Sequence, residues 1–344
     1  MSGPKPRLVV LNSTCLELVE EHRPEFEALG VELVADPGWR TWSPDRLDRE
    51  LGEAQALILP SGIANWPGAG DMARHRAWQV LSIAASGYEW LDVKAATRHG
   101  VAVTNALPVE GAEVVADLAW GLLLAVARQI PAHHQRLQQG DGARGMGSSV
   151  WGKTLGIVGL GRVGRATARR AAGFDMQVLA ATPHPDRQFA ATHRVGVVAL
   201  EELLRRSDYV SLHARLNSHT RGMIGPAQLA MMKSSAVLVN AARRELVDEE
   251  ALSQAILAGR LAGAGLDDPP SRPDTPLLHL PNVVFTPHLG NRAVEGVRAV
   301  LRCAVANAVE VLEGRRPASL VNPEVWDLLP AQRRFALAGE EGSR

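Results

Sequence analysis

The sequence predicts an α/β protein with two doubly wound, parallel-sheet domains. Its 344 residues favour two domains, because one domain takes about 150 residues. Short runs rich in leucine and β-branched residues alternate with longer helical patterns along nearly the whole chain, which is the order of a parallel sheet covered by helices. A glycine-rich segment at residues 138–149 divides this alternation, and its composition is typical of a flexible linker or a lid.

The first region contains five short apolar runs that we expect to be buried strands. They occupy residues 8–11, 31–35, 56–59, 80–84 and 101–104. Helical patterns at residues 16–29 and 91–98 are followed by Gly30 and Gly100, where a glycine commonly ends a helix. The next expected helix, residues 113–128, is apolar on most faces, as is usual for a helix buried between domains or at a subunit interface.

The second region starts at Trp151 and repeats the alternation. Seven strands are expected, at residues 154–158, 177–181, 195–198, 209–212, 236–240, 262–266 and 283–286. A final long helix is expected at residues 293–312, and the chain beyond about residue 330 is a polar tail.

Composition excludes several classes of protein. Lys and Arg number 37 and Asp and Glu number 37, so the formal net charge is zero, which argues against a basic nucleic-acid binder or an acidic disordered chain. Two cysteines, Cys15 and Cys303, cannot build a disulfide framework or a four-cysteine zinc site. The longest uncharged apolar stretch has ten residues, between Asp117 and Arg128, and about 18 are needed to span a membrane. We therefore expect a cytoplasmic protein with no membrane, nucleic-acid or metal partner.

The clearest motif is a glycine-rich turn between the strand expected at residues 154–158 and the helix that follows it. In such a turn the first glycine permits a tight bend, the second lets the backbone approach a pyrophosphate, and the third allows close packing of helix on strand. The helix N-terminus then faces the phosphates. In this context the motif predicts a dinucleotide-binding site rather than a structural turn. Its residues are Gly159, Leu160, Gly161, Arg162, Val163 and Gly164.

The second strand of a dinucleotide-binding unit usually ends with an acidic residue that binds the ribose. Here Thr182 occupies that place. A missing carboxylate removes repulsion against a 2′-phosphate, which His184 and Arg187 are placed to contact, so the sequence favours NADP over NAD. The alternative is that Asp186 reaches the ribose, or that the site accepts both cofactors.

Several segments together resemble the D-isomer-specific 2-hydroxyacid dehydrogenases. The resemblance implies a discontinuous, flavodoxin-like substrate domain of residues 1–106 and 290–330, with a Rossmann NAD(P)-binding domain, residues 107–289, inserted in it and residues 331–344 as a tail. It also implies an active site in the cleft between the domains and a homodimer through the helix near residues 113–128. The segments are residues 91–101 (LDVKAATRHGV), 156–161 (GIVGLG), 211–213 (SLH), 239–243 (VNAAR), 246–252 (LVDEEAL) and 281–288 (PNVVFTPH).

Two catalytic residues follow from this resemblance. Arg243 matches the arginine that binds the substrate carboxylate and polarises its carbonyl group, a task suited to a planar bidentate donor. His288 matches the acid that donates a proton to the carbonyl oxygen as hydride arrives, and histidine titrates in the range this role needs. The backbone amides of Ser86 and Gly87 match the loop that holds the carboxylate.

The resemblance also implies further cofactor contacts, and Asp267 matches an aspartate near the nicotinamide amide. Asn105 and Asp117 occupy other motif positions, for which no role is assigned. Besides the residues of the glycine-rich turn, the expected cofactor contacts are Thr182, His184, Arg187, His213, Ala241 and Asp267.

One expected residue is missing. The family has a glutamate after the pattern Leu-Asp-Val-Phe, and it pairs with the catalytic histidine and raises its pKa. An ungapped alignment from Asp267 puts Arg272 there, and a neighbouring cation would lower that pKa. The loop is also shorter than usual, which leaves the register open. Either another carboxylate, such as Asp268, replaces the glutamate, or the enzyme works without it, or the protein is not a dehydrogenase.

Unusual arginines occur at other family positions. Arg215 stands in place of a proline, Arg244 in place of a glycine, and Arg292 in place of a small residue. Some of Arg215, Arg272 and Arg292 are candidates for an extra anion site, and the substrate would then carry a second negative group. The alternative is that they are solvated or ion-paired surface residues.

The sequence is therefore interpreted as an NAD(P)-dependent oxidoreductase that reduces a small 2-oxo acid to a D-2-hydroxy acid. Two alternatives stay open. One is a specialised redox enzyme of secondary metabolism acting on a phosphonate or an aldehyde. The other is a weakly catalytic NAD(P) sensor similar to the corepressors of the family.

Overall fold

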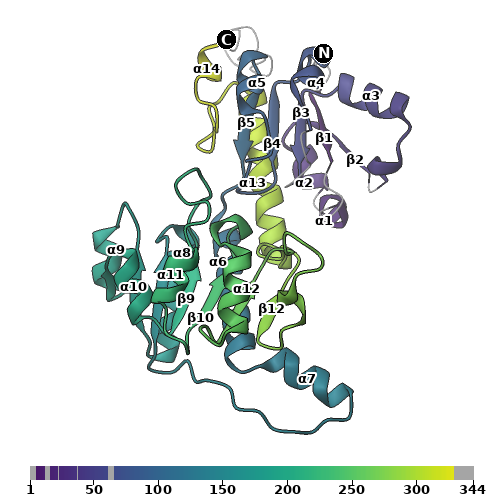
Figure 1. The fold of residues 1–344 in the computed structure, drawn as a ribbon. Helices are drawn as coiled ribbons and strands as arrows, with labels where there is room; N and C mark the ends of the chain where they lie inside the picture. Colours follow the sequence, from purple (N-terminus) through teal and green to yellow (C-terminus); the bar gives the residue numbers. More distant parts are fainter. Residues whose placement is uncertain (1–4, 12–15, 22, 37, 61–65, 329–344) are drawn as a thin grey trace. The chain divides into compact units, whose positions relative to one another are not determined.

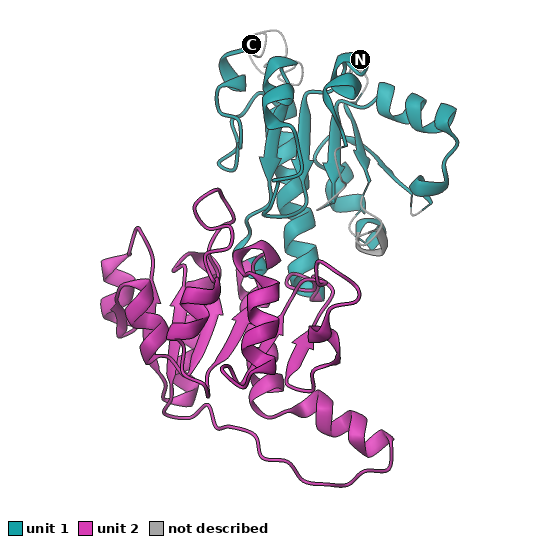
Figure 2. Ribbon diagram, in the orientation of Figure 1, with its two compact units in different colours: residues 1–111, 294–344 teal, residues 112–293 magenta. Residues whose placement is uncertain are grey.

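The computed structural model describes residues 5–11, 16–21, 23–36, 38–60 and 66–328 (Figure 1). They form two compact units, one of residues 1–111 and 294–344 and one of residues 112–293 (Figure 2). Each unit contains one parallel sheet with helices packed against it, so the predicted α/β class is confirmed. Cys15 and the tail expected at residues 331–344 lie outside the described residues.

The sheet of the first unit has five strands, all paired in parallel, in the order β2-β1-β3-β4-β5. The chain moves outward from β1 in both directions, so the sheet is doubly wound as predicted. The strands are β1 (Arg7–Val10), β2 (Glu32–Ala35), β3 (Ala56–Leu59), β4 (Val80–Ile83) and β5 (Ala102–Asn105).

The strands read as unbroken apolar runs because helices cover both faces of the sheet. Successive side chains alternate between the faces. Leu8 and Val10 belong to one buried core, with residues of the helices at 23–27 and 294–312. Val9 and Leu11 belong to another, with residues of the helices at 44–52, 69–74 and 93–98. The helices of this unit are α1 (Leu16–Glu21), α2 (Arg23–Glu27), α3 (Pro44–Gly52), α4 (Ala69–Arg74), α5 (Val93–Arg98), α13 (Val294–Leu312) and α14 (Val325–Leu328), with the 3₁₀ turn η1 (Trp39–Thr41).

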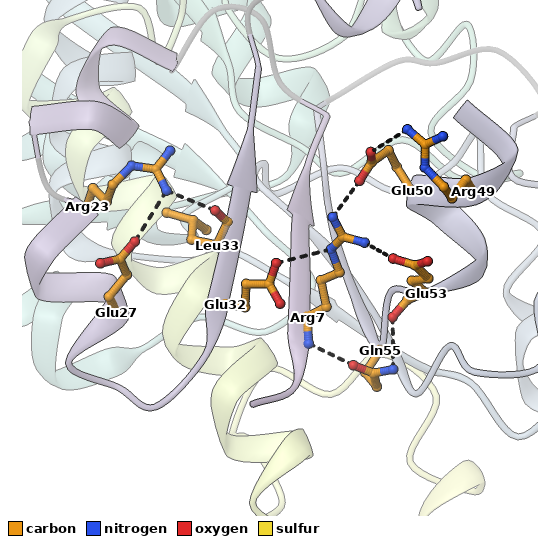
Figure 3. Close-up of polar contacts among 9 residues, drawn as sticks. All are labelled: Arg7, Arg23, Glu27, Glu32, Leu33, Arg49, Glu50, Glu53 and Gln55. Carbon is orange, nitrogen blue, oxygen red and sulfur yellow. Dashed lines mark hydrogen bonds and ion pairs between the residues drawn. The ribbon is translucent and has the colours of Figure 1, made fainter. Parts of the chain in front are cut away.

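Polar contacts hold the amino ends of β1 and β2 (Figure 3). Arg7 forms ion pairs with Glu50 at 2.6 Å and with Glu53, and its backbone N–H donates to the side chain of Gln55 at 2.7 Å. Arg23 donates to the Leu33 carbonyl at 2.8 Å. These contacts tie β1 to α3 and α2 to β2.

The end of the described chain returns to the first unit. α13 packs against β3, β4 and β5, and the Val321 N–H donates to the Val103 carbonyl at 2.8 Å. Asn322 is fully buried, accepts the Val103 N–H at 2.7 Å and donates to the Val101 carbonyl at 3.0 Å. This second segment therefore completes the unit.

The sheet of the second unit has seven parallel strands in the order β12-β11-β10-β9-β6-β7-β8. The direction of winding changes between β6 and β9. In sheets of this kind ligands bind at the carboxyl ends of the strands near that point. The strands are β6 (Thr154–Val158), β7 (Gln177–Ala181), β8 (Val195–Val197), β9 (Tyr209–Leu212), β10 (Val237–Asn240), β11 (Gly263–Leu266) and β12 (Val283–Phe285).

Two helices of this unit were predicted, the long apolar helix and the helix that follows the glycine-rich turn. The long apolar helix begins four residues earlier than predicted, and no helix or strand occupies residues 139–150. The helices are α6 (Val109–Ala127), which begins in the first unit, α7 (Ile130–Gln138), α8 (Arg162–Ala171), α9 (Arg187–Thr192), α10 (Leu200–Arg206), α11 (Pro226–Met231) and α12 (Glu249–Leu257), with 3₁₀ turns η2 (Ala172–Phe174), η3 (Arg244–Leu246) and η4 (Pro276–His279). Among the described residues, none of the helices has the length and apolar character needed to cross a membrane.

Candidate active site

The glycine-rich turn connects β6 to α8. Gly159 has a φ of 95°, and a Cβ there would lie 2.7 Å from the backbone nitrogen of Ala214. A Cβ on Gly164 would lie 2.1 Å from the Gly159 carbonyl oxygen. Gly161, the N-cap of α8, has no heavy atom within 4 Å of its Cβ position. Gly159 and Gly164 therefore permit the turn, and Gly161 leaves open space at a helix N-terminus, which fits a pyrophosphate.

The end of β7 carries no carboxylate that is free for a ribose. Thr182 is half-buried there, and His184 and Arg187 are exposed. Asp186 caps α9 by accepting the Phe189 N–H at 3.0 Å, and it forms an ion pair with Arg165 at 2.9 Å. The Phe189 N–H and Arg165 both lower the pKa of Asp186. Its carboxylate is thus engaged within the protein.

His213, which follows β9, is held beside the glycine-rich turn. Its Nε2 atom lies 2.9 Å from the Ser211 hydroxyl and 3.2 Å from the Thr167 hydroxyl. Burial lowers the pKa of His213 to about 4, so its ring is neutral near pH 7. Its buried Nδ1 atom has no hydrogen-bond partner within the described part of the chain.

Arg243 follows β10 in a turn shaped by Asn240. The side chain of Asn240 accepts the Ala242 N–H at 3.1 Å and donates to the Arg243 carbonyl at 2.8 Å. The guanidinium of Arg243 donates to the Ala242 carbonyl at 2.8 Å. This turn places Arg243 at the carboxyl edge of the sheet, next to the strand end that carries Asp267 and Asp268. Ala241, the first residue of the turn, is buried.

His288 follows β12 and contacts a carboxylate. Its Nδ1 atom lies 2.6 Å from Oδ1 of Asp268. The other oxygen of Asp268 accepts the Arg244 N–H at 2.9 Å. The hydrogen bond with Asp268 raises the pKa of His288, against the opposing effects of burial and of the nearby charge of Arg243. The arginine, the histidine and a carboxylate thus lie within one electrostatically coupled group.

Asp267 is buried and binds the turn that contains His288. Its Oδ1 atom accepts the Thr286 hydroxyl at 2.6 Å and the Leu289 N–H at 2.7 Å. A Cβ at Gly290 would lie 3.1 Å from its Oδ2 atom. Burial raises the pKa of Asp267. Neither Thr286, which belongs to the motif at residues 281–288, nor the backbone of Arg244 was predicted to take part in this site.

The three unusual arginines of the proposed anion site lie in three separate segments of the chain. Arg272 is exposed and forms two contacts with Asp274, at 3.1 and 3.0 Å. Its loop is held by Ser271, whose N–H and hydroxyl donate to Glu249. Asp268, and not Arg272, is therefore the residue hydrogen-bonded to His288. Arg215 and Arg292 are exposed, and the Arg292 N–H donates to the carbonyl of Leu289, the residue after His288, at 2.8 Å.

The substrate-binding residues expected in the first unit follow β4. Ser86 is exposed and Gly87 is buried. The side chain of Asn105, at the end of β5, donates to the Ser86 carbonyl at 2.7 Å. Among the described residues, no group of histidine, cysteine, aspartate and glutamate side chains is arranged to hold a metal ion.

Comparison with known proteins gives a consistent result. A family profile described as "D-isomer specific 2-hydroxyacid dehydrogenase, NAD binding domain" matches residues 120–290. A glyoxylate reductase of Korarchaeum cryptofilum is 40% identical over 261 residues, which are 73% of this chain and 78% of that protein. A D-3-phosphoglycerate dehydrogenase of Methanocaldococcus jannaschii is 39% identical over 285 residues, 81% of this chain but 53% of that protein.

Two solved structures have a fold similar to that of this chain. The TT0316 protein of Thermus thermophilus superimposes with a TM-score of 0.79 at 34% identity, over 92% of this chain and 99% of that one. A glyoxylate reductase of Paecilomyes thermophila has a TM-score of 0.78 at 26% identity, over 94% and 99% of the two chains.

Proposed function

This chain belongs to the D-isomer-specific 2-hydroxyacid dehydrogenase family, and from that premise we propose that it reduces a small 2-oxo acid to the D-2-hydroxy acid. The observation that carries the proposal is the 2.6 Å contact between His288 Nδ1 and Asp268. A carboxylate on Nδ1 fixes the tautomer of the imidazole and favours its protonated form. Nε2 is then the atom from which a proton leaves.

Each catalytic group has one task in this proposal. Arg243 binds the substrate carboxylate and polarises the carbonyl at C2. Its guanidinium is always charged and offers two parallel N–H donors to a carboxylate. His288 donates a proton from Nε2 to the carbonyl oxygen. Asp268 stabilises the charged imidazole and holds its orientation. In the oxidative direction the same imidazole accepts the proton.

A nicotinamide cofactor supplies the hydride when it is bound. The turn at Gly159, Gly161 and Gly164 and the first residues of α8, Arg162 and Val163, would hold its pyrophosphate. Ala241, His213 and Asp267 lie at neighbouring strand ends in the same unit. We assign all three to the cofactor site, with Asp267 near the nicotinamide amide.

NADP(H) is the cofactor that we propose this chain prefers. Residues 182–185 include no carboxylate, and Asp186 is engaged by α9 and Arg165. A 2′-phosphate would meet no repulsion there, and His184 and Arg187 offer donors on an exposed surface. Separate binding constants for NADPH and NADH, measured by fluorescence, test this preference.

We propose that the substrate is a small 2-oxo acid that carries a second anionic group, and that this group binds near Arg215 or Arg292. Arg272, whose guanidinium forms an ion pair with Asp274, is the third candidate. Phosphonopyruvate or oxaloacetate should then be reduced with a higher kcat/KM than pyruvate. Equal values for these substrates would reject the second anionic group without affecting the proposed reaction.

A homodimer through the helix near residues 113–128 is proposed as the assembly. On this helix Asp117 and Gly121 are exposed, and a Cβ at Gly121 would meet no atom within 4 Å. The neighbouring Ile130 and Leu137 of α7 are also exposed, at 56% and 65%. Light scattering coupled to size exclusion should give twice the chain mass of 36.9 kDa, and the chain mass itself would reject the dimer.

Oxidation of NADPH and of NADH by glyoxylate, pyruvate, hydroxypyruvate and phosphonopyruvate tests the reaction. We expect turnover of at least one 2-oxo acid, and a loss of about 10²- to 10⁴-fold in kcat for His288→Ala. The control is binding of the cofactor to the variant, which should be unchanged. Tight cofactor binding by the wild type without any turnover would reject the proposal and favour an NAD(P) sensor.

A further inference from the structure

Two successive carbonyl groups after β4 are tied to the end of β5. The side-chain amide of Asn105 donates to the Ser86 carbonyl at 2.7 Å, and the N–H of the next residue, Ala106, donates to the Ala85 carbonyl at 3.0 Å. The carbonyls of Ala85 and Ser86 therefore both point toward β5. Since a carbonyl only accepts hydrogen bonds, the Asn105 atom that faces Ser86 must be its NH₂ group.

The direction of these carbonyls fixes the direction of two N–H groups. In a trans peptide the carbonyl and the following N–H point in opposite directions. The N–H groups of Ser86 and Gly87 therefore both point away from β5. Within the described part of the chain, neither donates to another backbone group. Adjacent N–H groups aimed the same way form an anion-binding concavity.

Asn105 is itself fixed in place. It is 6% exposed, and its carbonyl accepts the side-chain amide of Asn307 on α13 at 3.1 Å. The preceding residue, Thr104, is fully buried and its hydroxyl donates to Ser82 at 2.8 Å. The Asn105 amide is thus a rigid donor, because the strand that carries it is held from both sides.

We propose that Asn105 is a positioning residue that turns the Ser86 and Gly87 amides toward the carboxylate of the substrate. This inference rests on the proposed function, because it assigns the carboxylate-binding donors of the same reaction. Asn105 does not touch the substrate in this assignment. It acts through the orientation of the peptide between Ser86 and Gly87.

The variant Asn105→Asp tests this role with little change of shape. A carboxylate cannot donate to the Ser86 carbonyl and repels it, so the peptide is released. We expect KM for the 2-oxo acid to rise at least about tenfold, while kcat changes less than about threefold and the affinity for NADPH stays constant. A KM within twofold of the wild type would overturn the proposal.

Asn322→Asp is the matched control for general damage. Asn322 is a buried asparagine that binds the same strand through Val103 and lies away from the Ser86 loop in the hydrogen-bond pattern. We expect it to lower the melting temperature without raising KM. An equal rise of KM in both variants would mean that Asn105 supports only the fold, and would overturn the positioning role.

A measurement on the wild type keeps the proposal testable if Asn105→Asp does not fold. Oxamate, a carboxylate analogue of a 2-oxo acid, is titrated into ¹⁵N-labelled protein, and the amide resonances of Ser86 and Gly87 are followed. We expect both to shift with oxamate and neither with acetamide, which lacks the carboxylate. If oxamate moves neither resonance, the inference is wrong even when the enzyme is active. If both shift while no 2-oxo acid is reduced, the proposed function fails and the anion site stands.

Discussion

Asp267 accepts the backbone N–H of Leu289 at 2.7 Å, so a buried carboxylate holds the residue that follows His288. The same oxygen accepts the Thr286 hydroxyl at 2.6 Å. His288 between them has a φ of 58°, a left-handed conformation that costs a non-glycine residue about 1 to 2 kcal/mol. The two consecutive aspartates thus share one task, since Asp267 fixes the backbone of the turn and Asp268 fixes the imidazole.

Asp267→Ala should release this turn. The Thr286 hydroxyl and the Leu289 N–H, which form partly buried hydrogen bonds, lose their shared acceptor. A hydrogen bond to a charged group contributes about 1.5 to 3 kcal/mol. We expect the free energy of unfolding to fall by about 3 kcal/mol and kcat to fall about tenfold or more, because the imidazole is no longer held. Urea unfolding and steady-state kinetics measure the two effects.

Thr286→Val is the graded control for Asp267→Ala. It removes the hydroxyl but leaves the hydrogen bond that the Leu289 N–H donates to Asp267, so we expect a loss of about 1 kcal/mol in stability and little change in kcat. A larger effect on kcat from the threonine variant than from the aspartate variant would contradict the role of Asp267 in holding the turn at His288.

The rate of reduction should depend on pH through the titration of His288. The pKa of His288 is raised chiefly by its hydrogen bond with Asp268, and reduction needs the protonated imidazole, so kcat/KM for reduction should stay high up to that raised pKa and fall above it. In Asp268→Asn the effects of burial and of Arg243 remain, and both lower the pKa. The fall should then occur at a lower pH, and kcat/KM at pH 7 should drop about tenfold to a hundredfold.

Stability should follow the same titration. The folded-state pKa of His288 lies above its unfolded value, so the stabilisation is complete below about pH 6.5 and is lost as the pH rises through the folded pKa. In Asp268→Asn this dependence should be lost and should reverse, because burial and Arg243 then lower the folded-state pKa of His288 and stability falls with decreasing pH. Glu249→Gln changes a carboxylate that binds Ser271 in the same loop and should leave the pH profile unmoved. A shift of equal size in both variants would assign the effect to the loop and not to the Asp268 carboxylate.

The sequence predicted the fold well because the central strands are buried on both faces and therefore form short apolar runs in the sequence. Gly30 and Gly100 have φ values of 82° and 68°, as expected at helix ends. The sequence left the partner of His288 open, with Asp268 as one alternative to Arg272. Asp268 is 20 residues away in the chain, and its place depends on a shortened loop held by Arg244 and Glu249. Alignment alone put Arg272 there, although its side chain turns outward to Asp274.

Substitution of Arg243 and of Arg272 should affect kcat/KM very differently. Arg243→Ala should lower kcat/KM for a 2-oxo acid about 10²- to 10³-fold, because the carboxylate and the carbonyl lose their bidentate donor. Arg272→Ala should change it less than about twofold, since an exposed ion pair contributes little. Steady-state kinetics with one 2-oxo acid measure both variants. A large loss from Arg272→Ala would instead support its part in an anion site.

The residue at the end of β7 should set the preference between NADPH and NADH. Thr182→Asp places a carboxylate where a ribose-binding acid usually stands, and it would repel a 2′-phosphate while accepting hydrogen bonds from ribose hydroxyls. We expect the Kd for NADPH to rise about tenfold to a hundredfold and the Kd for NADH to fall. Thr192→Asp, at the exposed end of α9, adds the same charge away from this strand and should leave the ratio of the two constants unchanged. If Thr182→Asp also leaves that ratio unchanged, Thr182 does not face the ribose, and the cofactor preference must be set elsewhere on the unit.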